Sequence, residues 1–327
     1  MVQRSRHLTA AMLVLGVAAV VPLAAAAAQT AAPSQTREPV RQEDARQFGD
    51  RLDGQIAGVC PVPGDGPPIG GPGDRAPLPH TRQRLAEGGP LVILAIGSSS
   101  TQGYGAPRPE ASYPFRLERD LARRYPDSRI QVINAGVGGE IAADQLARLD
   151  KLLAGNRPDL VIWQAGTNDA LRAVDRVRFA GEVRDGLARI RAHGADALLM
   201  DLQVYPGARD PETYAAYVAL MRRLATETAT PLYSRFDLMT AWENDRAHPS
   251  PDLLFTDRFH LNTIGYACIA RALGSAIAHA VDRAPADRAP ADRTPADRTP
   301  ADQASAAVSA PTSPAGSDQR MARDAAR

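Results

Sequence analysis

The chain has 327 residues, and its 38 lysines and arginines nearly balance 37 aspartates and glutamates, which leaves a formal net charge of +1. A chain of this length folds into one or two domains. Its small net charge excludes a protein whose overall field draws it to nucleic acid or to an anionic membrane. With two cysteines and no matching histidine cluster, we expect no metal site.

The first 28 residues have the layout of a secretory signal peptide. Arg4 and Arg6 precede an uncharged apolar stretch, and small residues follow at Ala26–Ala28. This layout predicts cleavage near residue 28 and a periplasmic or secreted mature protein. The alternative is a membrane anchor, because the apolar stretch is about long enough to span a bilayer. We expect no other membrane span.

Residues 29–89 form a leader rich in proline and glycine, as in CPVPGDGPPIGGPGDRAPLPH. This composition excludes a long helix or a central strand, although residues 37–55 allow one short helix. Cys60 lies in the leader and Cys268 near the far end of the domain. An even number of cysteines in an oxidising compartment favours a disulfide between them. The alternative is a free Cys60 and a buried Cys268.

Residues 90–281 alternate strand patterns with helical patterns. The strands are expected at Leu91–Ile96, Arg129–Asn134, Asp159–Trp163, Ala197–Leu202 and Pro231–Tyr233. The helices are expected at Tyr113–Arg124, Ala142–Ala154, within Val174–Ala192 with an interruption or cap near Gly181, and at Pro211–Thr228 and Thr263–Ala280. Strands that alternate with helices predict an α/β domain with a doubly wound parallel sheet flanked by helices.

Residues 282–327 begin with a five-residue repeat, APADRAPADRTPADRTPADQ, and contain no aromatic residue. A proline in each period and alanine as the main apolar residue leave nothing to build a core. We therefore expect a disordered tail.

Four segments of the domain carry polar residues beside glycines or at a helix start. They are GSSSTQG (97–103), NAGVGGE (134–140), QAGTNDA (164–170) and FTDRFHLN (255–262). The carboxyl ends of parallel strands lie at one edge of a sheet, so these segments can converge. A serine, glycine amides, an asparagine, an aspartate and a histidine in one crevice are the groups that acyl transfer needs.

The four segments resemble, in order, the four blocks of the SGNH (GDSL-type) hydrolases: G-D-S-x-T-x-G, a glycine block, G-x-N-D and D-x-x-H. The resemblance spans about residues 91–273 and implies a flavodoxin-like three-layer sandwich. AIGSSSTQGYGA and YACIARAL are also similar to an exported subgroup from Gram-negative bacteria. That subgroup implies a cysteine at the places of Cys60 and Cys268, in keeping with a disulfide.

The resemblance implies that Ser99 is the nucleophile. Ser98 then stands where the family usually carries aspartate, and Ser100 is the fallback nucleophile. The alternative role for Ser99 is a helix N-cap.

Two histidines occur in a D-x-x-H pattern, His260 after Asp257 and His248 after Asp245. The family block and the helix expected after Asn262 favour Asp257 and His260 as the acid and the base. Asp245 and His248 are then expected in a solvated surface loop.

For the oxyanion that ester attack creates, the resemblance implies three donors: the N–H groups of Ser99 and Gly139 and the side-chain amide of Asn168. Gly138 is the alternative donor if the register shifts by one residue. Asn168 has an alternative role as a turn residue, and Asp169 is expected to cap the following helix.

These features predict an exported serine ester hydrolase that works through an acyl-enzyme without metal or cofactor. By analogy with the family, its substrates are small or medium acyl esters, such as O-acetylated glycans or lysolipids. We expect a monomer whose partner is a small-molecule or glycan ester and not nucleic acid. The alternatives are an O-acyltransferase with the same catalytic groups, or a non-catalytic domain that binds phosphate or carbohydrate.

Overall fold

The computed structural model describes residues 78–244 and 250–282, together with residues 47, 49–51, 54 and 60. The expected signal peptide, most of the leader, the tail and the pair Asp245 and His248 lie outside the described residues. Residues 47, 49–51 and 54 are helical, as the short helix expected within residues 37–55 requires.

Five parallel strands form the sheet in the order β2-β1-β3-β4-β5. They are β1 (Leu91–Gly97), β2 (Ile130–Gly136), β3 (Leu160–Gln164), β4 (Asp196–Met200) and β5 (Leu232–Tyr233). Strand β1 has β2 on one side and β3 on the other, so the strand order reverses beside β1. In doubly wound sheets the crevice for a ligand opens at the carboxyl ends of the strands beside this reversal.

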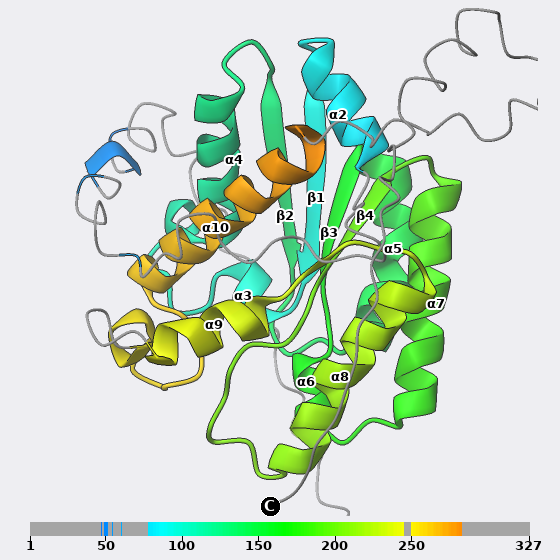
Figure 1. Cartoon of the computed structure of the whole chain (residues 1–327), viewed down its shortest axis with the longest axis vertical. Helices are drawn as coiled ribbons and strands as arrows, with labels where there is room; N and C mark the ends of the chain where they lie inside the picture. The colour runs from blue at the N-terminus through cyan, green and yellow to red at the C-terminus, as the bar shows by residue number, and fades with distance from the viewer. Residues whose placement is uncertain are drawn as a thin grey trace, which may run out of the picture. The chain divides into compact units, whose positions relative to one another are not determined.

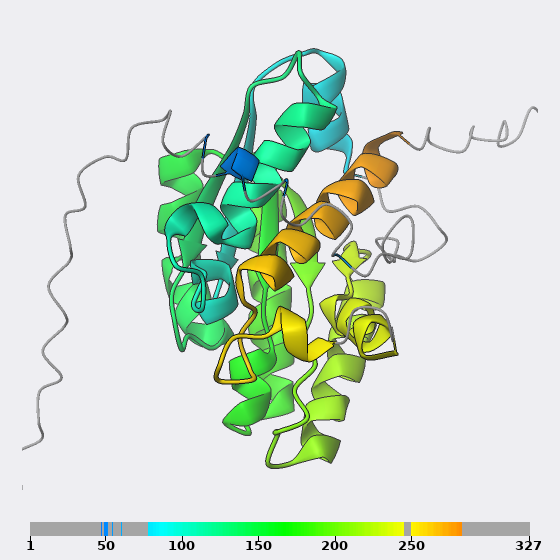
Figure 2. The ribbon, with the colours of Figure 1, turned by 90° about the vertical axis from the view of Figure 1, so that its left-hand side faces the viewer.

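Helices cover both faces of the sheet (Figure 1). The described helices are α2 (Pro79–Ala86), α3 (Ser99–Gln102), α4 (Tyr113–Arg124), α5 (Ala142–Asn156), α6 (Thr167–Leu171), α7 (Arg176–Ala192), α8 (Pro211–Glu227), α9 (Arg235–Asn244) and α10 (Thr263–Asp282), with 3-10 turns at Pro109–Ala111 and Ser250–Leu253. Helices α4 and α10 pack on one face (Figure 2), and α5, α7 and α8 pack on the other. The predicted fold class is confirmed.

The alternation of side chains along each strand explains the two cores. In β1, Ile93 and Ala95 join the cluster under α4 and α10. Leu94 and Ile96 join the cluster under α5, α7 and α8. All four side chains are fully buried. A continuous apolar run is therefore needed here, because a parallel strand buries both of its faces.

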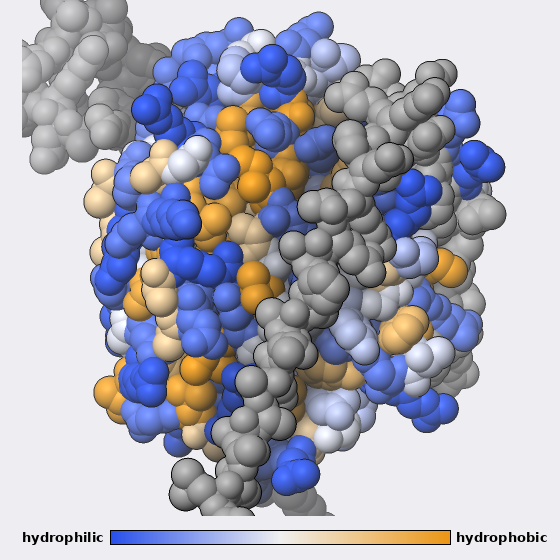
Figure 3. Space-filling model, turned by 180° about the vertical axis from the view of Figure 1, so that it is seen from behind, coloured by the Kyte–Doolittle hydropathy of each residue, from blue (hydrophilic) through white to orange (hydrophobic). Residues whose placement is uncertain are grey.

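The outer faces of the helices are hydrophilic. Seen from behind the view of Figure 1, hydrophilic residues dominate the described surface, and hydrophobic residues form smaller patches between them (Figure 3). Ion pairs such as that of Arg189 with Asp185 and Asp150 lie on these faces. Helix α10 is the one described helix long and apolar enough to span a membrane. However, 72% of its most apolar 18-residue stretch is buried inside the domain, so α10 is a core helix here.

Two local predictions were wrong or incomplete. Helix α7 runs without interruption past Gly181, where an added Cβ would meet nothing within 4 Å. The glycine therefore lies in open space and does not end the helix. Helix α2 lies in the stretch that we expected to be a leader. It packs on the domain, because Leu78 is fully buried in the core and Thr81 donates its N–H and hydroxyl to Asp196 Oδ2, each at 2.9 Å.

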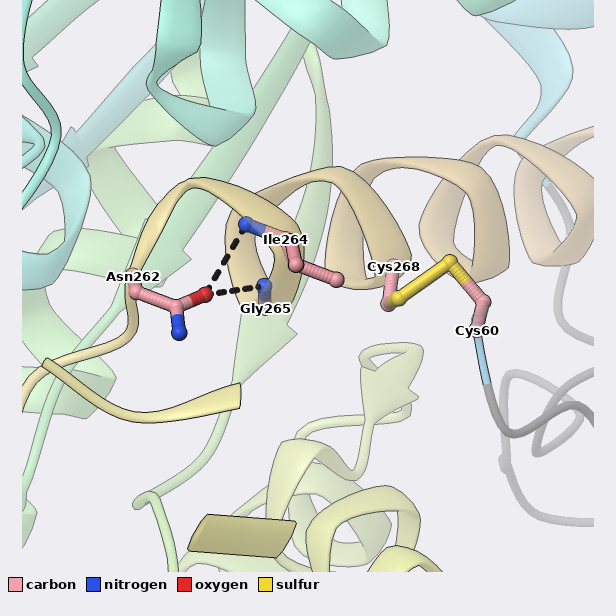
Figure 4. Close-up of a disulfide and its surroundings, with 5 residues drawn as sticks. All are labelled: Cys60, Asn262, Ile264, Gly265 and Cys268. Carbon is pink, nitrogen blue, oxygen red and sulfur yellow. Dashed lines mark hydrogen bonds between the residues drawn. A yellow bond between two sulfur atoms is a disulfide. The ribbon is translucent and has the colours of Figure 1, made fainter. Parts of the chain in front are cut away.

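The predicted disulfide is present. Cys60 and Cys268 are bonded, with their Cα atoms 5.3 Å apart, and both are buried (Figure 4). Cys268 lies in α10. The bond therefore fixes residue 60 of the leader to the helix that follows the D-x-x-H segment.

Candidate active site

The sharp turn after β1 brings the three serines to the carboxyl edge of the sheet. Strand β1 ends at Gly97, and Ser99 is already the first residue of helix α3. A Cβ on Gly97 would lie 2.2 Å from Thr101 Oγ1 and 2.7 Å from Gln164 Oε1. Real Cβ atoms do not approach other atoms this closely, so the turn requires glycine at position 97.

Each of the three serines has a different partner. Ser98 donates its N–H and its hydroxyl to Gln164 Oε1, at 3.0 and 3.2 Å. Ser99 Oγ lies 2.7 Å from His260 Nε2. Ser100 Oγ donates to Gln203 Oε1 at 3.0 Å. Of the three hydroxyls, that of Ser99 is the one beside a base, as the family resemblance implies for the nucleophile.

Asp257 holds the imidazole of His260 from the other side. His260 Nδ1 lies 2.7 Å from Asp257 Oδ2, and Asp257 Oδ1 accepts the N–H groups of Phe259 and His260 at 2.9 Å each. Burial alone would raise the pKa of Asp257, but these hydrogen bonds outweigh it and lower the pKa below its usual value. A carboxylate can only accept, so the proton of a neutral imidazole lies on Nδ1 and leaves Nε2 to accept from the hydroxyl of Ser99.

The loop after β2 lies against the turn that carries Ser99. A Cβ on Gly138 would come within 3.9 Å of Ser99 Cβ, and Gly139 has a φ of +82°, which favours glycine. Asn168 donates one amide hydrogen to Glu140 O at 2.8 Å, which leaves the second hydrogen free for another acceptor. The N–H of Ser99 belongs to the first turn of α3, where helices offer no intrahelical acceptor.

Asp169 has a different position from the one predicted. Its Oδ1 accepts the N–H of Ala142 at 3.0 Å, so it caps the start of α5 and not the helix that follows it. Burial raises the pKa of Asp169 to about 6. The carboxylate therefore joins the segment after β3 to the one after β2.

Sequence reasoning did not identify several residues around His260. The ring of Tyr104, which is 52% exposed, lies 4.4 Å from the His260 ring between centroids. The ring of Phe259 lies 4.6 Å from His260 and 4.6 Å from Tyr205. Gln164 and Gln203 were also missed, although both follow or end a buried strand at the expected edge of the sheet. That position was the signal that could have pointed to them.

Comparisons with known sequences place the chain among ester hydrolases. The model of the non-GDSL lipase-like family matches residues 71–283. The chain is 30% identical over 154 residues to the esterase TesA of Pseudomonas aeruginosa, an alignment that covers 47% of this chain and 71% of TesA. It is 29% identical over 166 residues to the thioesterase 1/protease 1/lysophospholipase L1 of Escherichia coli, which covers 49% of this chain and 76% of that protein.

Solved structures share the fold. A two-domain esterase active on acetylated mannans superposes with a TM-score of 0.55 at 22% identity, over 64% of this chain and 55% of that one. The crystal structure of TesA gives a TM-score of 0.50 at 24% identity, over 57% of this chain and 98% of that one. The chain thus spans about half the length of the two-domain esterase and nearly all of the TesA structure.

Proposed function

The chain belongs to the non-GDSL lipase-like family of SGNH-type serine ester hydrolases, and from this premise we propose that Ser99, His260 and Asp257 are its catalytic triad. The observation that supports the proposal is a chain of two hydrogen bonds. Asp257 Oδ2 lies 2.7 Å from His260 Nδ1, and His260 Nε2 lies 2.7 Å from Ser99 Oγ. A hydroxyl becomes a good nucleophile only when a base takes its proton, and this geometry supplies that base.

The proposed reaction has two halves. As Ser99 Oγ bonds to the ester carbonyl carbon, His260 Nε2 takes its proton and the carbonyl electrons move to oxygen. The oxyanion then collapses, the bond to the alcohol breaks, and His260 returns the proton to the departing alcohol. In the second half, water attacks the carbonyl carbon of the acyl-enzyme while His260 takes a proton from the water. His260 then gives this proton to Ser99 Oγ as the bond between Oγ and the acyl carbon breaks and the acid is released.

We propose small or medium acyl esters as substrates, with the acyl group on a glycan or in a lysolipid. The names of the relatives support this class, since one acts on acetylated mannans and another is a thioesterase and lysophospholipase. The layout of the first 28 residues supports export, and the Cys60–Cys268 bond suits the oxidising compartment of an exported protein.

Labelling with a fluorophosphonate tests the proposed nucleophile. The reagent should react with the folded protein in a 1:1 ratio, and mass spectrometry should place the adduct on Ser99 and not on Ser98 or Ser100. Heat-unfolded protein is the control and should remain unlabelled. An adduct on either neighbouring serine, or no adduct on the folded protein, would refute the assignment of Ser99.

Replacing Asn168 by alanine should lower kcat by about 10²–10³-fold, the usual cost of losing one oxyanion donor. KM should change little, because the donor acts on the charge that develops in the transition state. Steady-state kinetics on an aryl acetate measure both constants. Arg172→Ala is the control: Arg172 also binds the glycine loop, through Gly139 O at 2.7 Å, but it is not a proposed donor. An Asn168→Ala variant with the kcat of the wild type would remove Asn168 from the oxyanion site.

A further inference from the structure

We propose that Gln203 is a positioning residue that fixes the turn bearing Ser99 against the loop bearing His260. The inference rests on the proposed function, because it assumes that Ser99 and His260 react together. Gln203 follows strand β4, and no family block contains it. Each end of its side-chain amide bonds to the direct neighbour of a proposed catalytic residue.

The two contacts are on opposite sides of the amide. Gln203 Oε1 accepts the hydroxyl of Ser100 at 3.0 Å, and Gln203 Nε2 donates to Phe259 O at 2.6 Å. Ser100 follows Ser99, and Phe259 precedes His260. The backbone oxygen of Phe259 can only accept, so Nε2 must face it and Oε1 must face Ser100. The orientation of the amide follows from these partners.

Gln203 is itself held rigidly. Its side chain is buried, with the residue 1% exposed, and its backbone oxygen accepts the hydroxyl of Tyr214 at 2.8 Å. Tyr205, two residues later, packs its ring against that of Phe259. A buried amide that is hydrogen-bonded at both ends has one low-energy position. Because Gln203 follows β4, its amide holds both loops at fixed positions relative to that strand.

Gln164 differs from Gln203 in what it joins. Gln164 Oε1 accepts from Ser98 and Thr101, which both belong to the turn that carries Ser99. Gln164 therefore shapes one loop, whereas Gln203 links two. The nucleophile and the base lie 161 residues apart in the sequence, and their hydroxyl–imidazole contact of 2.7 Å depends on how these loops meet.

Replacing Gln203 by methionine keeps the approximate volume but removes both hydrogen bonds. We expect kcat to fall by about 10²-fold with KM nearly unchanged, since a misplacement of about 1 Å at a reacting pair has a cost of that order. The decisive measurement repeats the substitution in a His260→Ala background, with an activated aryl ester to detect the residual rate. With the base absent, its position no longer matters, so Gln203→Met should change the residual rate less than twofold. An equal loss in both backgrounds would overturn the proposal, because it would show a general structural effect.

Two further variants keep the test decisive if Gln203→Met folds poorly. Gln203→Glu preserves the shape and the acceptor for Ser100, and its carboxyl can donate to Phe259 O only while it is protonated, so kcat should fall relative to the wild type as the pH rises and the carboxyl ionises. A kcat equal to that of the wild type across the whole pH range would overturn the proposal. Gln145→Met is the matched control, because Gln145 is equally buried and its side chain bonds to neither loop. Gln145 Oε1 instead accepts the indole N–H of Trp163 at 2.6 Å. This control variant should keep its kcat, and a loss equal to that of Gln203→Met would also overturn the proposal.

Hydrolysis and labelling by the wild-type protein distinguish a failure of this inference from a failure of the proposed function. If the wild type hydrolyses the ester and labels at Ser99 while the Gln203 variants keep full kcat, the positioning role alone fails. If the wild type does neither, the proposed function fails and the role of Gln203 fails with it.

Discussion

Ser99→Ala and His260→Ala should each lower kcat by at least about 10³-fold, and the double variant should be little worse than either single one. The reason is that the hydroxyl and the imidazole act as one unit: without the base the hydroxyl keeps its proton, and without the hydroxyl the base has nothing to activate. Their atoms already lie 2.7 Å apart, so each variant removes one half of an existing contact. Ester hydrolysis followed by absorbance, with Tm recorded for every variant, measures the effect.

Asp257→Ala should cost less than either substitution, because the aspartate orients His260 and takes no proton itself. His248→Ala is the control, since His248 belongs to the other D-x-x-H pattern. It should retain wild-type kcat. An inactive His248→Ala together with an active His260→Ala would show that we chose the wrong histidine.

Of the substitutions proposed, removal of the disulfide should lower the free energy of unfolding the most. In the chain-entropy model, closing a loop as long as the 208-residue separation of Cys60 and Cys268 stabilises the fold by about 5 kcal/mol. We expect the Cys60→Ala/Cys268→Ala variant to lose free energy of unfolding on that order, measured by urea denaturation. Its kcat at low temperature should remain close to that of the wild type, because the bond touches no proposed catalytic group.

Activity should survive because hydrogen bonds, and not the disulfide alone, hold the start of α10 in place. Asn262 Oδ1 accepts the N–H groups of Ile264 and Gly265, at 2.9 and 3.0 Å, and so caps the helix beside His260 (Figure 4). Its amide nitrogen donates to Asp252 O at 2.7 Å. Each single cysteine variant is a control and should lose as much stability as the double variant, since either one breaks the bond. An unfolding midpoint equal to that of the oxidised wild type would contradict the prediction.

Strong periodic patterns were sufficient to predict most of the sheet and its main helices. Helix α4 has the predicted bounds, and of its apolar residues at helical spacing Leu117 and Leu121 are fully buried while Phe115 is half-buried. The family membership predicted from four short blocks is confirmed. These features are local in the sequence, and a buried helix face or strand leaves a regular hydrophobic pattern.

Features that depend on distant partners were not predictable in the same way. Helix α2 has little apolar periodicity, and its first turn bonds Asp196, 115 residues after Thr81. Gln203 and Ser100 are 103 residues apart, and a glutamine in a loop has no pattern of its own. The expected interruption at Gly181 failed for the opposite reason: the local signal was present, but no neighbour reinforced it. Tertiary contacts override such weak local preferences.

Ser99 and His260 are 161 positions apart in the sequence, so hydrolysis by the proposed pair can begin only after both have been made. Ribosomes make the chain from its amino end, so strand β1 and the proposed nucleophile are complete long before the proposed base exists. A nascent chain shorter than 260 residues therefore carries the proposed nucleophile without the proposed base, and we expect esterase activity only once residue 260 has been made and its loop has folded against the turn at Ser99.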